Sequence, residues 1–216
     1  MKNKYLDPKN YFRKAGFIKD RLLYWPLYNR EKFEEEELNK FSKYNFDFNK
    51  AKEEINDILN DLGKNPIDSQ DGMGSVHWVL FSCIKQVSEI KNILELGTYD
   101  GETSLVLSKL FPDSKITTVD LPEDDPIFLG SYGRQDNKIK DMFNSTRDQN
   151  LSNKNIKYIE RNSLFLLEEI SGEFDLVWVD AGHLYPEISW DIANGYQLCR
   201  NSGWILCDDI IPHKRG

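Results

Sequence analysis

The sequence is poor in cysteine and has no long apolar run, and both facts narrow what the protein can be. Its three cysteines, Cys83, Cys199 and Cys207, form no C-x-x-C pair and have no histidine at zinc-finger spacing. We interpret them as reduced thiols in a protein core. No apolar stretch approaches the roughly 20 residues that span a bilayer, and the first residues lack the continuous apolar core of a signal peptide. The simplest expectation is a cytoplasmic protein with no transmembrane segment.

A net positive charge is also missing. The chain carries 28 Lys and Arg against 36 Asp and Glu, a net charge of -8, which argues against a nucleic-acid partner because phosphate binding needs a basic surface. Residues 1–30 are the exception, with a local charge of +6 and several aromatic side chains. This arm either folds onto the acidic body, which we favour, or contacts an anionic substrate, a membrane surface or a second copy in a homo-oligomer.

The length of 216 residues suits one catalytic domain with an appended segment. Residues 31–62 are highly charged, with apolar residues spaced as one face of one or two helices, and a second helical pattern covers residues 75–88. We therefore predict an N-terminal basic arm and helical segment over residues 1–70 and a ligand-binding domain over residues 71–216.

From residue 93 onward, short apolar runs alternate with amphipathic segments. Predicted strands cover 93–96, 116–119, 156–159, 176–179 and 204–207, and predicted helices cover 102–110, 136–150, 164–170 and 185–199. Strands that alternate with helices imply right-handed crossovers, so the expected fold class is α/β with a doubly wound, mostly parallel sheet. Ligands of such sheets bind beyond the carboxyl ends of the strands.

Polar residues follow each predicted strand. In ILELGTYDGETS, residues 93–104, Gly97 and Gly101 would let the turn backbone approach a ligand, and a helix begins next. Asp120 closes the second strand, 19 residues after Gly101, a distance at which an acid reaches ribose hydroxyls. A purely structural Asp at a strand end is the alternative.

The glycine spacing is not the G-x-G-x-x-G of dinucleotide sites. E-x-G-x-x-x-G followed by an acid resembles motif I of the class I S-adenosylmethionine-dependent methyltransferases, which have a Rossmann-like fold, and the resemblance covers residues 93–211. The turn looks most like that of the catechol O-methyltransferase type. By this resemblance the cofactor is S-adenosylmethionine, and its site is formed by Glu95, Gly97, Tyr99, Gly101, Thr103, Asp120, Asn162 and Ser163. Tyr99 and Thr103 would hold the methionine carboxylate, Asp120 the ribose, and Asn162 with Ser163 would border the adenine.

Three carboxylates follow the fourth and fifth predicted strands, namely Asp180, Asp208 and Asp209. Neighbouring strands lie about 4.8 Å apart, so these groups would converge and repel one another unless a hard divalent cation, most simply Mg²⁺, lies between them. The metal-dependent O-methyltransferases resemble this pattern, although they commonly have Asn at the position of Asp209. Capping of a turn, or pairing with a basic residue, is the alternative for Asp208 and Asp209.

His183 follows Asp180 by three residues, where the macrolide-sugar O-methyltransferases look to carry a histidine. A group with a pKa near neutrality can remove a hydroxyl proton, so we predict His183 as the catalytic base. A structural loop histidine is the alternative. Residues 121–137 are either a specificity loop, in which Arg134 could meet an anionic group, or a surface excursion.

These residues together predict an S-adenosylmethionine-dependent O-methyltransferase that acts on a small-molecule hydroxyl, of a sugar, polyol or phenolic compound, with a divalent cation. A metal-dependent hydrolase or hydroxylase, or a cofactor-binding assembly protein, are the alternatives. The superfamily's sheet normally continues past the fifth strand, whereas this chain ends soon after it. Either the chain is C-terminally incomplete, or the N-terminal segment covers the sheet edge.

Overall fold

The computed structural model describes residues 39, 42–67, 77–182 and 185–208. Its contacts divide the chain into two compact units, Met1–Phe46 and Asp47–Gly216. In the first unit, the described residues include a short 3-10 helix, η3 (Ser42–Tyr44), and the rings of Tyr44 and Phe46 stack with centroids 5.4 Å apart. The second unit contains the sheet and all of the other described helices.

Two helices precede the sheet among the described residues of the second unit. Helix α3 (Phe48–Asp61) begins where the Asp47 carboxylate accepts a hydrogen bond from the Lys50 backbone N–H, and α4 (His77–Val87) follows. Glu54 of α3 accepts hydrogen bonds from Ser82 Oγ at 2.5 Å and Lys85 Nζ at 2.6 Å. These contacts fix α3 against α4. Both helices lie within the segments predicted to be helical, 31–62 and 75–88, and most of residues 31–41 lie outside the described part of the chain.

The sheet is parallel throughout its described strands. They are β1 (Asn92–Leu96), β2 (Lys115–Asp120), β3 (Ile156–Glu160), β4 (Phe174–Val179) and β5 (Cys199–Cys207), in the spatial order β3-β2-β1-β4-β5. The order reverses between β1 and β4, so the switch point where such folds bind ligands lies there. The predicted α/β, Rossmann-like fold is confirmed.

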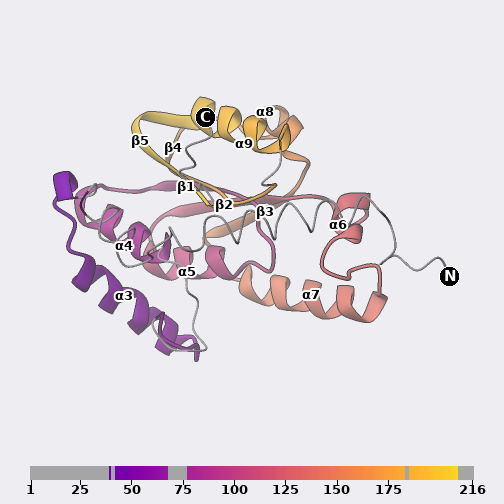
Figure 1. Ribbon diagram of the computed structural model, residues 1–216, viewed down its shortest axis with the longest axis horizontal. Helices are drawn as coiled ribbons and strands as arrows, with labels where there is room; N and C mark the ends of the chain where they lie inside the picture. The colour runs from indigo at the N-terminus through magenta and orange to yellow at the C-terminus, as the bar shows by residue number, and fades with distance from the viewer. Residues whose placement is uncertain (1–38, 40–41, 68–76, 183–184, 209–216) are drawn as a thin grey trace, which may run out of the picture. The chain divides into compact units, whose positions relative to one another are not determined.

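Helices cover both faces of the sheet. After β1 and β2 come α5 (Glu102–Leu110), α6 (Pro126–Gly130) and α7 (Asn137–Asn150); after β3 and β4 come η4 (Ser163–Phe165), α8 (Leu166–Glu169) and α9 (Glu187–Leu198). In Figure 1, α8 and α9 lie on one side of the sheet, and α4, α5 and α7 lie on the other. Every residue of β4 is buried, as a central strand of a two-sided sheet requires.

The main departure from the predicted elements concerns β5. The strand begins at Cys199, five residues before the predicted start at Trp204, and its pairing with β4 shifts register between Phe174 and Leu176. The extra residues, 200–203, are polar or glycine, so they carry no apolar strand signal. The pairing passes from Phe174 with Cys199 to Leu176 with Trp204, and Ser202 has a left-handed φ of +64°, so residues 200–203 form a bulge rather than a regular extended stretch.

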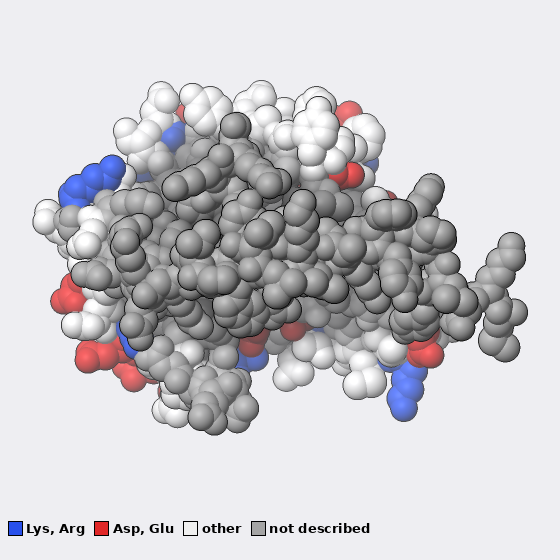
Figure 2. Space-filling model, viewed as in Figure 1, with Lys and Arg blue, Asp and Glu red and all other residues white. Residues whose placement is uncertain are grey.

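On the face drawn in Figure 2, basic and acidic side chains of the described residues are interspersed around the rim. Among these residues, no helix has both the length and the apolar composition that crossing a membrane would require.

Candidate functional site

A cavity of about 610 Å³ opens at the carboxyl ends of the strands. Its lining includes most of the residues that the sequence singled out there: Gly97, Tyr99, Asp120, Asn162, Ser163, Asp180 and Asp208. They follow β1, β2, β3, β4 and β5, so parallel strands bring them together from segments more than 100 residues apart. His183 and Asp209 lie outside the described residues.

Position 97 requires a glycine because the end of β4 packs closely against it. Its φ is +100°, and a Cβ at this position would lie 2.1 Å from the backbone oxygen of Asp180 and 2.8 Å from Ala181 Cα. The Asp180 N–H also donates to Leu96 O at 2.8 Å. The bare glycine therefore lets the end of β1 pack on the end of β4, in addition to leaving the cavity open.

Gly101 packs against the end of α7. It is the N-cap of α5 with a φ of +77°, and a Cβ there would lie 2.9 Å from Leu151 Cδ2 and 3.3 Å from Asn150 Cβ. Gly101 is not part of the cavity lining. The glycine accommodates the end of α7, whose Asn150 side chain donates to Asp100 O at 2.8 Å.

Tyr99 and Asp120 are held together at the cavity. Tyr99 has a φ of +50°, and its backbone N–H donates to Asp120 Oδ2 at 2.8 Å, while Leu121 N–H donates to Oδ1 at 2.7 Å. Burial raises the pKa of Asp120 despite these two bonds. Because each carboxylate oxygen is fixed by one backbone donor and has a further lone pair, the group is oriented to accept hydrogen bonds from a ligand.

Glu95 lies behind the cavity wall rather than on it. It is 1% exposed, and its carboxyl accepts hydrogen bonds from Ser104 Oγ and, at 2.6 Å, from Thr118 Oγ1. Burial raises its pKa to about 8. Thr103 is also outside the lining, and its hydroxyl accepts from Trp78 Nε1 at 3.2 Å. Both residues support the glycine turn and α5 from within the protein.

The segment after β3 forms part of the cavity lining. Asn162 caps η4, because its Oδ1 accepts from Leu164 N–H at 3.0 Å, and Asn194 Nδ2 donates to Ser163 O at 2.8 Å. Asp191 of α9, which sequence reasoning missed, also lines the cavity and is 1% exposed. It bonds to Ser163, but its Oδ1 has no hydrogen-bond partner within the described structure, and burial raises its pKa.

Asp180 and Asp208 follow adjacent strands in matching register. Val179 pairs with Cys207, and the Asp208 N–H donates to Val179 O at 3.0 Å, so the two aspartates occupy the next neighbouring positions. Their carboxylates are the type of oxygen donor that hard divalent cations take. Within the part of the chain that is described, no group of three potential metal ligands gathers, and the third predicted ligand lies outside it. The cation site therefore stays a prediction.

His77 lies in the segment predicted to be helical, and its ring is near the strand ends. It begins α4, and its ring stacks on Trp178 with centroids 4.9 Å apart. Burial lowers its pKa to about 4, and the nearby charge of Asp208 opposes this shift. The neutral ring thus lies beside the strand-end acids. Its apolar neighbours in the sequence made it resemble an ordinary core position of a helix.

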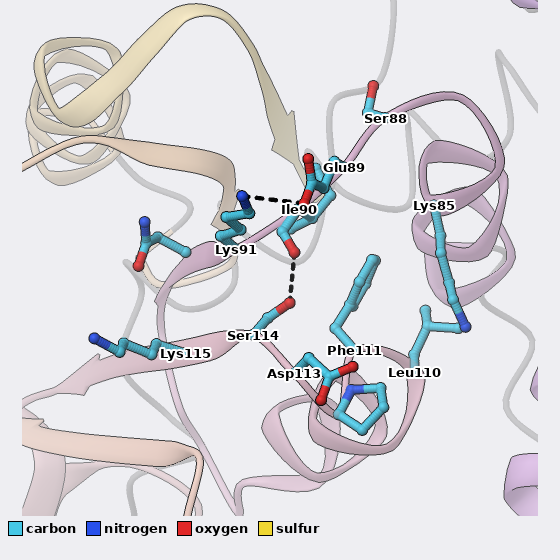
Figure 3. A pocket seen from close by; sticks show the side chains of 12 residues that line it. Lys85, Ser88, Glu89, Ile90, Lys91, Leu110, Phe111, Asp113, Ser114 and Lys115 are labelled. Carbon is cyan, nitrogen blue, oxygen red and sulfur yellow. Dashed lines mark hydrogen bonds and ion pairs between the residues drawn. The ribbon is translucent and has the colours of Figure 1, made fainter.

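A second cavity, of about 600 Å³, lies at the opposite edge of the sheet (Figure 3). There Ser114 Oγ donates to Ile90 O at 2.6 Å, and Lys91 pairs with Glu89 at 3.1 Å. It is formed by the segments that enter β1 and β2, so it contains none of the strand-end carboxylates. Ligands of parallel α/β sheets bind at the other edge, and we place the functional site there.

Solved structures with similar folds include several methyltransferases. The O-methyltransferase TomG from Streptomyces achromogenes is 16% identical over 81% of this chain and 76% of its own, with a TM-score of 0.43. The methyltransferase PaMTH1 from Podospora anserina is 21% identical over 84% and 70%, with a TM-score of 0.42. An O-methyltransferase family protein from Burkholderia thailandensis is 17% identical over 55% of this chain, with a TM-score of 0.41. This chain covers 32% of that protein's length.

The sequence itself gives the family. No curated protein matches it significantly. A family model described as a methyltransferase domain matches residues 94–210, which run from within β1 to just past the end of β5 and so cover the described sheet apart from the first two residues of β1. The chain therefore belongs to the methyltransferase domain family, as the glycine turn and the acid after the second strand predicted.

Proposed function

We propose that this methyltransferase transfers the methyl group of S-adenosylmethionine to a hydroxyl of a small molecule, such as a sugar, polyol or phenolic compound, assisted by a divalent cation. The observation that best supports this function is the position of Asp120. Its carboxylate is held by two backbone N–H groups beside the Gly97 bend, in the same cavity as Asp180 and Asp208. The cavity volume also falls in the range of small-ligand sites, roughly 300–1,000 Å³.

The cofactor would lie along the strand ends. In this proposal Asp120 accepts hydrogen bonds from the ribose hydroxyls, and Asn162 and Ser163 border the adenine. The methionine portion passes the bend at Gly97, where the absence of a side chain leaves room, and the exposed Tyr99 side chain is available to hold it. Bound in this way, S-adenosylmethionine supplies an activated methyl group on its sulfonium sulfur.

The acceptor would bind on the side of Asp180 and Asp208. These two residues, with Asp209, are proposed to hold the cation, which as a Lewis acid lowers the pKa of a coordinated hydroxyl. His183 is proposed to remove the hydroxyl proton. The chain's own part in the reaction is therefore to orient the acceptor, accept its proton and hold the donor in line, and positioning of this kind contributes much of a rate enhancement.

Calorimetry with S-adenosylhomocysteine tests the cofactor site. We expect the wild-type chain to bind it, and Asp120→Ala to weaken binding about 10- to 100-fold, since hydrogen bonds to a charged group contribute about 1.5–3 kcal/mol. Asp113→Ala, at the exposed opposite edge of the sheet, is the matched control and should bind normally. A wild-type chain that binds no S-adenosylhomocysteine would contradict the proposal.

The cation is tested separately. Methyl transfer from radiolabelled S-adenosylmethionine to a panel of hydroxylated sugars, polyols and phenols should require Mg²⁺ or Mn²⁺ and should be lost on chelation. Asp208→Asn should raise the cation concentration needed for half-maximal rate, while the affinity for S-adenosylhomocysteine stays the same. Transfer that is unaffected by a chelator would remove the cation from the proposal and leave the cofactor site intact.

A further inference from the structure

Arg134 is a buried arginine in the wall of the cavity. It follows α6, the residue is 5% exposed, and it lines the same cavity as Asp120. Its guanidinium carbon lies 4.0 Å from the ring centroid of Phe128 and 4.4 Å from that of Phe143. The two aromatic side chains thus cover the guanidinium, and its N–H groups, which point outward in the guanidinium plane, remain for acceptors.

The charge of Arg134 is not balanced by an ion pair within the described residues. Among the described residues, the guanidinium makes one protein hydrogen bond, from Nε to Ser131 O at a long 3.3 Å, and no carboxylate lies within ion-pair distance. Two neighbouring arginines differ in this respect: Arg147 pairs with Glu123 and Arg161 with Glu168, each at 2.6 Å. Burying a charge without a partner costs free energy, so the unpaired guanidinium of Arg134 indicates that a bound anion supplies the counter-charge.

Asp120 does not supply that counter-charge directly. It is near enough to favour the charged form of Arg134, but no hydrogen bond or ion pair joins the two side chains, and the Asp120 oxygens accept instead from the N–H groups of Tyr99 and Leu121. Burial has the larger effect and lowers the pKa of Arg134. The guanidinium therefore lies beside the proposed ribose site with donors that no described protein carboxylate uses.

We propose that Arg134 forms an anion subsite of the cavity, which binds a carboxylate or phosphate group of a bound ligand. The flanking rings of Phe128 and Phe143 hold the guanidinium plane in position, and a planar fork of donors suits both anions. The anion is either the carboxylate of the cofactor's methionine portion or an acidic group on the methyl acceptor. This subsite rests on the proposed function, because that function makes the cavity the ligand site.

Two adenosine ligands distinguish the two sources. S-adenosylhomocysteine has the amino-acid carboxylate, whereas 5′-methylthioadenosine has the same adenosine and sulfur without it. If Arg134 binds the cofactor, Arg134→Gln weakens S-adenosylhomocysteine about 10- to 100-fold and leaves 5′-methylthioadenosine unchanged. Lys138→Gln, which removes an exposed positive charge nearby, is the control for long-range electrostatics and should leave both affinities unchanged.

If Arg134 instead binds the acceptor, Arg134→Gln leaves both adenosine ligands unchanged. In that case inorganic phosphate, added to the wild-type complex with S-adenosylhomocysteine, should shift the Arg134 Nε–H resonance in an NMR titration. The same titration of Arg134→Lys should show at least a several-fold weaker phosphate response, read from backbone amides of the 131–134 segment, because lysine lacks the planar fork. Thermal unfolding identifies any variant that has lost its fold, and Arg134→Lys, which keeps the charge, then replaces Arg134→Gln.

The inference is overturned if Arg134→Gln folds, binds S-adenosylhomocysteine as tightly as the wild type, and phosphate leaves the Arg134 resonance of the wild-type complex unmoved. Failure of the proposed function has a different signature. In that case the wild-type chain binds neither adenosine ligand, whereas the phosphate titration of the free protein still reports on Arg134.

Discussion

Substitution of Glu95 by glutamine should flatten the pH dependence of folding stability. In the folded protein Glu95 is 1% exposed and accepts hydroxyl hydrogen bonds from Ser104 and Thr118, and burial raises its pKa to about 8 from an ordinary 4.5. The folded state therefore holds a proton that the unfolded chain releases near pH 4.5. The contribution of Glu95 to the free energy of unfolding is fully present below that pH, and it is lost progressively as the pH rises towards 8.

The magnitude follows from the same two pKa values. Each unit of pKa difference corresponds to about 1.4 kcal/mol, so ionisation of Glu95 removes up to about 4 kcal/mol between pH 5 and pH 8. This is an upper value, because water penetration and relaxation reduce the cost of a buried charge. Glutamine has nearly the same shape, its amide oxygen can accept from both hydroxyls, and it has no proton to lose in this range.

Urea unfolding at pH 5, 6, 7 and 8 measures the effect. We expect the stability of Glu95→Gln relative to the wild type to rise with pH by an amount on the order of 2–4 kcal/mol. Every other titrating group is shared, so the difference between the two curves isolates Glu95. Glu53→Gln, on an exposed position of α3, is the control for removing one carboxyl. Parallel curves for Glu95→Gln and the wild type would show that Glu95 is already ionised in the folded protein and would refute the reasoning.

Three further substitutions test the packing around the cavity. Gly97→Ala should destabilise the fold by about 3 kcal/mol or more, because its Cβ would meet the rigid backbone oxygen of Asp180 at 2.1 Å. Gly101→Ala should lower the free energy of unfolding by about 1–2 kcal/mol, since the left-handed backbone is strained for alanine but the Leu151 side chain can move. Equal losses of unfolding free energy for the two variants in urea would contradict this comparison. Asp191→Asn should raise the melting temperature more at pH 8 than at pH 5, because burial raises the pKa of Asp191 and the wild-type fold loses stability as that group ionises. A lower melting temperature at pH 8 would show that the charged form is stabilised by the protein.

The regular elements were predictable because their signals are local. The helix at 102–110 was predicted at its observed bounds, and α7 begins at Asn137, one residue after the predicted start, with Asp136 as its N-cap. Five apolar runs separated by helices also sufficed to predict the parallel sheet, and strand ends then placed Asp120, Asp180 and Asp208 at one edge. The start of β5 was missed, because residues 200–203 are polar or glycine and form a bulge between two paired stretches of the strand.

The wall of the cavity was less predictable, because it depends on contacts between distant segments. Glycine spacing alone could not show that Gly101 faces Leu151 rather than the cavity, or that Glu95 lies behind the wall. Asp191 and His77 had no motif, since each sits in an amphipathic helix where its neighbours indicate a core. The sequence shows Arg134 as a lone arginine among aromatic residues of a loop. Only the structure shows that it is buried and therefore differs from an ordinary surface arginine.

The contact between Gly97 and Asp180 has a mechanistic consequence for the two halves of the proposed site. Gly97 belongs to the bend that the cofactor would pass, and Asp180 begins the segment that would hold the cation. Their backbones are in close contact, and the Asp180 N–H donates a hydrogen bond to the carbonyl of Leu96, the residue before Gly97. Because Asp208 N–H in turn donates to Val179 O, the ends of β1, β4 and β5 form one rigid hydrogen-bonded edge. A side chain at position 97 would have to displace the β4 end, so it should disturb both the methyl-donor site and the spacing of Asp180 and Asp208. In the proposed function, backbone contacts would thus set the distance between donor and acceptor, and an in-line transfer would require that precision.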